Sequence, residues 1–184
     1  MTQPDVRSCN SLPKAFKVVH LTTLVLFIVL VLSGAALYVG SLESIVGNRA
    51  LVAYVHVYSG LFILVPFLIS LINVNAHPRL ASVYEELSRW SPTDKAKFFG
   101  MPLERSKRFN GGQKLMANAL LAALIILLIS GVVMASYIPL SISMRQGATF
   151  VHDLMAFIVA VLFTGHLLLA IRHPQALRSI FKFK

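Results

Sequence analysis

The chain has 184 residues, of which 57% are hydrophobic and 13% charged, and its mean hydropathy is +0.74. This composition excludes an ordinary soluble globular domain and indicates a membrane protein. A net charge of +10 would suggest nucleic-acid binding in a soluble protein, but here its distribution argues for membrane topology and lipid headgroups, and against nucleic acid.

Four stretches are nearly free of charge and exceed the ~20 residues that a membrane-crossing helix requires. Because lipid offers no hydrogen-bonding partners to the backbone, each stretch is expected to be a transmembrane α-helix. We therefore predict an all-α membrane protein, a four-helix bundle that forms one domain over residues 1–184. The predicted helices I to IV cover residues 16–39, 50–75, 112–137 and 147–172. The first is too long for the apolar region of a signal peptide, so we expect it to be retained.

The basic residues set the expected orientation. Apart from Arg49 and Arg145, every Lys and Arg lies in the N-terminal segment, in the loop between helices II and III, or in the C-terminal tail. The positive-inside rule places these three segments, and therefore both termini, in the cytoplasm. Arg49 and Arg145 are then in external loops. We expect a multi-pass protein of the cytoplasmic (inner) membrane of a bacterium or archaeon.

The loop between helices II and III contains a helix signal. Ser91, Pro92 and Asp94 have the spacing of a helix start with a capping box. The residues that follow, Lys95–Phe99, are amphipathic and end at Gly100. We therefore predict a cytoplasmic amphipathic helix that lies on the membrane surface.

Histidines stand inside three of the four predicted spans. His20 is near the start of helix I, His56 is in helix II, and helix IV carries both His152 and His166. Fourteen residues separate the two histidines of helix IV, which places them on one face of an α-helix and about 21 Å apart along its axis. Ionisable side chains within a bilayer are costly and indicate a functional site.

An internal repeat relates helices I and II to helices III and IV. Several features of the first half recur in the second at an offset of 96 or 97 residues. They are Lys17 with Lys114, Ser33-Gly34 with Ser130-Gly131, His56 with His152, and His77-Pro78 with His173-Pro174. The Ser-Gly pairs are expected to let a neighbouring helix or a flat ring approach the backbone closely. The histidines before proline are interpreted as helix-end residues rather than ligands.

Depth in the membrane pairs the four histidines of the spans. His56 and His152 each lie seven residues after an external arginine, whereas His20 and His166 lie near the inner surface. Neutral imidazole is a good ligand of haem iron, and bundle cores commonly house such cofactors. We therefore predict two stacked b-type haems, an outer one held by His56 and His152 and an inner one held by His20 and His166. The alternative is a cofactor-free membrane anchor whose histidines only bridge helices.

A polar, glycine-rich segment at the start of helix III lies near the depth of His166. Its amide side chains and glycine backbone can hydrogen-bond a quinone carbonyl, so Asn110, Gly112 and Gln113 are candidate quinone contacts. A helix N-cap formed by Asn110 explains the same segment equally well on spacing alone.

Nearly the whole chain resembles the gamma subunit of membrane-bound respiratory formate dehydrogenase, a dihaem cytochrome b family. The most specific likeness is Phe109-Asn110-Gly111-Gly112-Gln113-Lys114, which is similar to the family's Asn-x-Gly-Gln-Lys stretch at the start of helix III. The positions of the histidines in helices I, II and IV also match. The resemblance implies the same four axial ligands. It also implies menaquinone beside the inner haem, with contacts at Asn110, Gly112 and His166.

The resemblance further implies partner subunits. An iron–sulfur (beta) subunit would deliver electrons, and a molybdenum or tungsten catalytic (alpha) subunit would oxidise formate, in a complex that can form a higher oligomer. This chain carries no formate-oxidising chemistry of its own. Cytochrome b subunits of nickel–iron hydrogenases and of thiosulfate or polysulfide reductases share much of this plan and are the alternative assignment.

Overall fold

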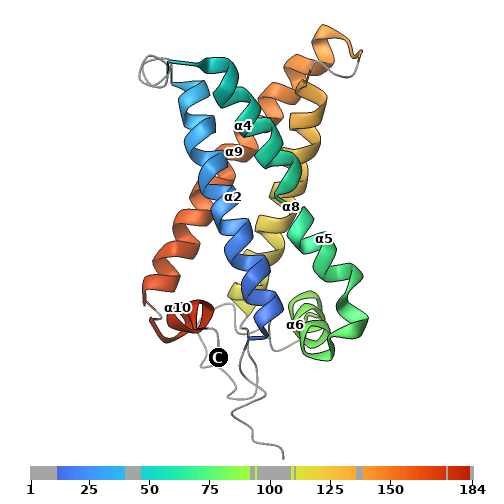
Figure 1. Cartoon of the computed structure of the whole chain (residues 1–184), viewed down its shortest axis with the longest axis vertical. Helices are drawn as coiled ribbons and strands as arrows, with labels where there is room; N and C mark the ends of the chain where they lie inside the picture. Colours follow the sequence, from blue (N-terminus) through green and yellow to red (C-terminus); the bar gives the residue numbers. More distant parts are fainter. Residues whose placement is uncertain are drawn as a thin grey trace, which may run out of the picture.

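The computed structural model of the protein describes residues 12–39, 47–91, 94, 109, 111–135, 139–172 and 174–182 (Figure 1). Every regular element within these ranges is a helix, and four helical stretches are long and apolar enough to cross a membrane. The predicted all-α, four-helix membrane bundle is therefore confirmed.

Three of the spans are single helices close to the predicted ranges. Helix I is α2 (Lys14–Tyr38), helix III is α8 (Gly111–Met134) and helix IV is α9 (Ile142–Arg172). Helix IV begins earlier than predicted because Ser141 caps it: the Ser141 hydroxyl oxygen accepts a hydrogen bond from the Met144 backbone N–H at 3.3 Å. Arg145, which we predicted in an external loop, therefore lies in the first turn of α9.

Helix II is broken into α4 (Arg49–Phe62) and α5 (Val65–Ile72). Pro66 accounts for the break, because proline has no N–H to donate and its ring clashes with the carbonyl four residues earlier, at Phe62. The span predicted as one helix over residues 50–75 is thus two helical segments, and α5 diverges from the rest of the bundle (Figure 1).

A short helix follows the second span of each half. After the 3-10 turn η1 (Val74–Ala76), α6 (Pro78–Ser88) begins with a proline, and α10 (Pro174–Phe181) begins in the same way after α9. The helix α6 was not expected, because a His-Pro pair can end one helix as well as start the next. Both short helices lie at the end of the bundle where α2 starts (Figure 1), which we call the α6–α10 end.

The amphipathic helix predicted after Ser91 lies largely outside the described residues, because Lys95–Phe99 are not among them. Its capping box is present. The Ser91 backbone N–H donates to Asp94 Oδ2 at 2.9 Å, and the Asp94 backbone N–H donates to the Ser91 hydroxyl oxygen at 3.2 Å. The amphipathic helix that the structure describes between helices II and III is α6, which buries Leu80 and Val83.

The spans pack as two hairpins that follow the internal repeat. α2 packs along α4, and α8 packs along α9. The two halves meet where α4 contacts α8, and where the rings of Phe27 and Phe163 lie 4.7 Å apart between centroids. The short helices cross between the halves, since α6 contacts α8 and α10 contacts α2. The α6–α10 end is therefore a further place where the two repeats contact each other.

Candidate functional site

The structure brings the four histidines of the spans together in two pairs. His56 of α4 faces His152 of α9 with 6.3 Å between ring centroids, and His20 of α2 faces His166 of α9 with 6.1 Å. These are the pairs that depth predicts. We call His56–His152 the far pair, because it is remote from the α6–α10 end, and His20–His166 the near pair.

The ring separations can be tested against a bound haem. A bond from a divalent metal to an imidazole nitrogen is about 2 Å long and the ring centroid lies about 1 Å behind that nitrogen, so two rings that ligate one iron from opposite sides have centroids about 6 Å apart. Both pairs have this separation. Each pair offers two ligands, which is what haem iron needs, because the porphyrin supplies the other four. Among the described residues, no cluster of three or more His, Cys, Asp or Glu side chains offers an alternative metal site.

The helix α9 carries one ring of each pair and sets the distance between them. His152 and His166 are fourteen residues apart within the uninterrupted helix Ile142–Arg172. At a rise of about 1.5 Å per residue, the two rings are about 21 Å apart along the axis. The two pairs therefore span much of a hydrocarbon core that is about 30 Å thick.

Serine hydroxyls orient both rings of the far pair. The Ser33 hydroxyl donates to the Val29 carbonyl at 2.6 Å, so its oxygen is left to accept a hydrogen bond from His56 Nδ1 at 2.9 Å. This assigns the proton to Nδ1 and leaves Nε2 with a free lone pair for a metal. A partner that orients the second ring nitrogen is a regular feature of metal-ligating histidines.

The second repeat has the same arrangement. The Ser130 hydroxyl donates to the Ile126 carbonyl at 2.8 Å and accepts from His152 Nδ1 at 3.0 Å. Both serines are buried, at 7% exposure for Ser33 and 5% for Ser130. The repeated Ser-Gly pairs therefore serve the far-pair histidines directly, a role that the sequence alone did not reveal.

The glycine after each serine makes room for the same ring. A Cβ added at Gly34 would lie 3.2 Å from His56 Cε1, and one added at Gly131 would lie 3.4 Å from His152 Cε1. As expected, these small residues allow close approach, and the group that approaches is an imidazole ring of the adjacent helix. Each Ser-Gly pair holds one histidine of its own repeat by a hydrogen bond and by contact.

The near pair has aromatic surroundings instead. The Phe16 ring stacks on His20 with centroids 6.3 Å apart and planes tilted by 13°. Phe16 also approaches Tyr84 of α6 at 6.4 Å and Phe109 at 6.5 Å. Because the Ser70 hydroxyl donates to the Phe67 carbonyl at 2.7 Å, its oxygen accepts a hydrogen bond from the Tyr84 hydroxyl, and burial raises the pKa of this phenol.

The predicted quinone contacts lie at the start of α8. Gly112 and Gln113 are both exposed in its first turn, at the α6–α10 end, and Asn110 lies outside the described residues. Gly111 is buried, and a Cβ there would come within 2.6 Å of the Asp94 carbonyl oxygen. The backbone around residue 111 is therefore packed tightly, while the two following residues are open.

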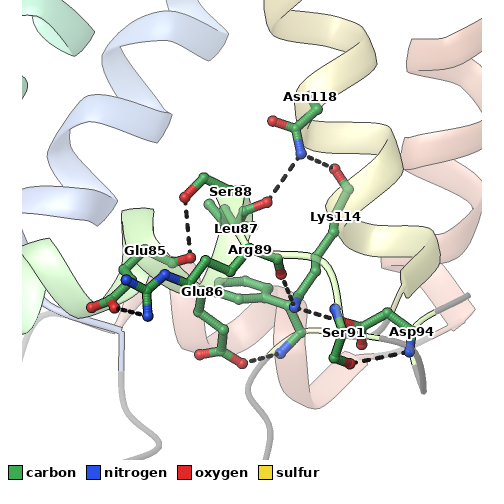
Figure 2. A network of polar contacts seen from close by, with 10 residues as sticks. Glu85, Glu86, Leu87, Ser88, Arg89, Ser91, Asp94, Lys114 and Asn118 are labelled. Atoms are coloured by element: carbon green, nitrogen blue, oxygen red, sulfur yellow. Dashed lines mark hydrogen bonds and ion pairs between the residues drawn. The ribbon is translucent and has the colours of Figure 1, made fainter.

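A buried ion pair anchors this turn to the loop before it (Figure 2). Lys114 Nζ donates to Asp94 Oδ2 and to the Arg89 carbonyl, each at 2.9 Å, and both charged side chains are about 5% exposed or less. The Ser91 backbone N–H, followed by Lys114, holds the pKa of Asp94 well below its usual range. The Asn118 amide adds a hydrogen bond to the Leu87 carbonyl at 3.0 Å. These contacts fasten the end of α6 to α8.

Four membrane spans that carry two histidine pairs are an arrangement that suits a membrane-bound cytochrome b. The family model described as prokaryotic cytochrome b561 matches residues 11–183, and the chain belongs to this family. Cytochromes b bind haem b, so the chain is a multi-pass prokaryotic membrane protein of b-type electron transfer. A comparison with curated proteins finds no match. The match supports a b-type cytochrome membrane subunit but not a formate dehydrogenase gamma subunit in particular.

Proposed function

We propose that the chain is a dihaem cytochrome b subunit of a respiratory oxidoreductase, and that electrons pass between the far pair and the near pair on the way to a quinone. A haem b at each pair supplies one-electron redox chemistry. The observation that carries the proposal is the ring separation of 6.3 Å and 6.1 Å in two pairs that share one helix, since one iron between two imidazoles requires about 6 Å.

The residues of the chain orient and space the two irons. His56 and His152 present Nε2 because Ser33 and Ser130 occupy Nδ1. The helix α9 holds the two sites about 21 Å apart, so an electron that moves between them crosses much of the bilayer. Moving one charge across a membrane stores about 2.3 kcal/mol per 100 mV.

The distribution of charge supports an orientation. Apart from Arg49 and Arg145, the basic residues of the described ranges lie in or next to the helix ends at the α6–α10 end, and the positive-inside rule makes that end cytoplasmic. The far pair is then close to the external surface, where an iron–sulfur subunit would donate electrons. The near pair is close to the cytoplasm, where a reduced quinone takes up protons.

Ring contacts support a quinone site next to the near pair. Phe109 precedes the predicted contact Asn110, and its ring lies 6.5 Å from Phe16, which stacks on His20. Gly112 and Gln113 are exposed at the same end of the bundle. We therefore propose that a quinone, menaquinone by the resemblance, is reduced against this turn of α8.

The electron-donating complex has two candidates. The Asn110–Lys114 stretch favours a formate dehydrogenase, with iron–sulfur and molybdenum or tungsten subunits as partners. A nickel–iron hydrogenase is the second candidate, because the short name of the matching family model refers to a nickel-hydrogenase cytochrome b. Affinity purification of the chain from its native membrane, followed by assays for formate and hydrogen oxidation, separates the two.

A reduced-minus-oxidised difference spectrum with haem quantification tests the central proposal. We expect a b-type α-band and two haems per chain in the purified full-length protein. A cofactor-free anchor would show no α-band, and a single haem would contradict the assignment of one haem to each pair.

A further inference from the structure

Two lysines at the same position of the repeat are buried at the α6–α10 end. Lys17 of α2 is 7% exposed and Lys114 of α8 is 3% exposed. Burying an ammonium group costs several kcal/mol unless hydrogen bonds and opposite charge compensate it. Each lysine must therefore have a partner that repays this cost.

Both lysines donate to the backbone carbonyl that ends a short helix. Lys17 Nζ lies 2.7 Å from the Lys182 carbonyl oxygen, directly after α10, and Lys114 Nζ lies 2.9 Å from the Arg89 carbonyl oxygen, directly after α6. The carboxyl end of a helix carries unpaired carbonyls and partial negative charge, so it suits a buried cation.

The two contacts are reciprocal between the repeats. The helix α6 ends the first repeat and is held by Lys114 of the second, whereas α10 ends the second repeat and is held by Lys17 of the first. Each lysine thus fastens the last element of the opposite half. Only one of the two lysines, Lys17, lies on a helix that carries a near-pair histidine.

Lys17 joins the start of α2 to the far end of α10. It lies three residues before His20 on α2, and its acceptor, the Lys182 carbonyl, directly follows α10, the helix that comes after the one bearing His166. We propose that Lys17 is a positioning residue for the near pair, and that its bond to the end of α10 keeps α2 and α9 at the separation at which both rings can ligate one iron. This inference rests on the proposed haem at that pair.

The repeat explains why the near pair needs such a contact. The repeat mates of His20 and His166 are Ala117 and Ser70, so the near pair has no symmetric counterpart and joins α2 of one half to α9 of the other. The far-pair rings are each held by a Ser-Gly pair within their own hairpin. For the near pair, the contact that fixes the start of α2 is the bond from Lys17 to the residue that follows α10.

The substitution Lys17→Met in the full-length protein tests this, because it keeps the side-chain length and removes the ammonium. Loss of a group that orients a metal ligand typically weakens metal binding about 10- to 100-fold. In a redox titration of the purified protein, each bound haem is expected to give one wave. For Lys17→Met we expect selective loss of the wave that His166→Ala also removes, which we call the near-pair wave, while the far-pair wave persists. Trypsin should also cleave after Arg178 faster, since α10 is released. Lys17→Arg, which can still donate to the Lys182 carbonyl, should keep both waves.

Three further variants separate positioning from a general loss of stability. Lys14→Met makes the same charge change at an exposed site one turn earlier and should retain both haems. Ser179→Pro disrupts α10 without altering α2 and should reproduce the Lys17→Met result. Lys114→Met removes the reciprocal contact and should spare the near-pair wave.

The outcomes distinguish this inference from the proposed function. If the unaltered protein binds fewer than two haems, the proposed function fails. If it binds two and Lys17→Met keeps both, or loses both equally, the positioning role of Lys17 is wrong while the proposed function stands. Loss of the near-pair wave in Lys114→Met would likewise overturn the inference.

Discussion

The far pair and the near pair share one ring separation but differ in what holds them. Each far-pair ring is hydrogen-bonded by a serine and packed on a glycine of the preceding helix in its own repeat. Both pairs take one ring from each repeat, but in the near pair His20 stacks on Phe16, and the His20 and His166 ring centroids lie 6.1 Å apart. The comparison teaches that each ring of the symmetric site is oriented within its own hairpin, whereas we infer that the asymmetric site depends on the Lys17 contact at the α6–α10 end.

The largest expected effect concerns the α6–α10 end as a whole. Lys114→Met leaves Asp94 buried without its cationic partner, which typically costs about 3–5 kcal/mol. We expect a lower thermal unfolding temperature in detergent, with both haems still bound in the folded fraction. Lys114→Met combined with Asp94→Asn should cost less than the sum of the two single changes, and strict additivity would show that the pair is not coupled.

A smaller and more local effect is expected at the far pair. Ser33→Ala leaves His56 Nδ1 without its hydroxyl partner, and we expect about 10- to 100-fold weaker haem retention at the far pair only. Ser130→Ala should behave alike, because its geometry is the same. Thr164→Ala removes a hydroxyl that donates to a backbone carbonyl of its own helix, at 2.8 Å, and should change neither redox wave. An effect of Ser33→Ala on the near-pair wave would contradict the claim that Ser33 acts on the far pair alone.

A modest steric effect should follow Gly34→Ala. The new Cβ would lie 3.2 Å from His56 Cε1, and displacing the ring should cost about 1 kcal/mol and shift the far-pair potential. Gly131→Ala, at 3.4 Å, should have a weaker effect. Gly147→Ala adds a Cβ with nothing within 4 Å and should leave both potentials unchanged. Equal shifts in all three variants would argue against ring contact as the cause.

The smallest expected effect is the pH dependence of the unfolding temperature that arises from the Asp94 carboxyl. Its folded-state pKa is lowered by the Ser91 N–H and by Lys114, so its stabilisation is complete above the unfolded value of about 3.9 and is lost as pH falls below that value. The unfolding temperature of the wild type should therefore drop below about pH 4 more steeply than that of Asp94→Asn. Between pH 5 and 8 this carboxyl should contribute no pH dependence, and a slope there would point to another group.

Sequence alone predicts the spans and the histidine pairs because both depend on local regularities. Apolar length defines the helices, and the fourteen-residue spacing of His152 and His166 sets their depth. Ligation of haem iron by these residues stays a prediction that the ring separations support.

What the sequence did not reveal depends on contacts between helices. Ser33 reaches His56 only because α4 packs against α2, and this packing cannot be read from the sequence, although the internal repeat includes Ser33. From the sequence, Lys17 and Lys114 are ordinary basic residues near a membrane surface. The structure shows that both are buried. The break in helix II had a signal in Pro66, but proline is tolerated in membrane helices often enough that its effect was not predicted.

The most direct test of the account is a redox titration of His20→Ala and His56→Ala beside the unaltered protein. The account predicts two b-type waves in the unaltered protein, loss of one wave in His20→Ala, and loss of the other in His56→Ala. Loss of both waves to the same extent in each variant, or the persistence of both waves in either variant, would contradict the assignment of one haem to each histidine pair.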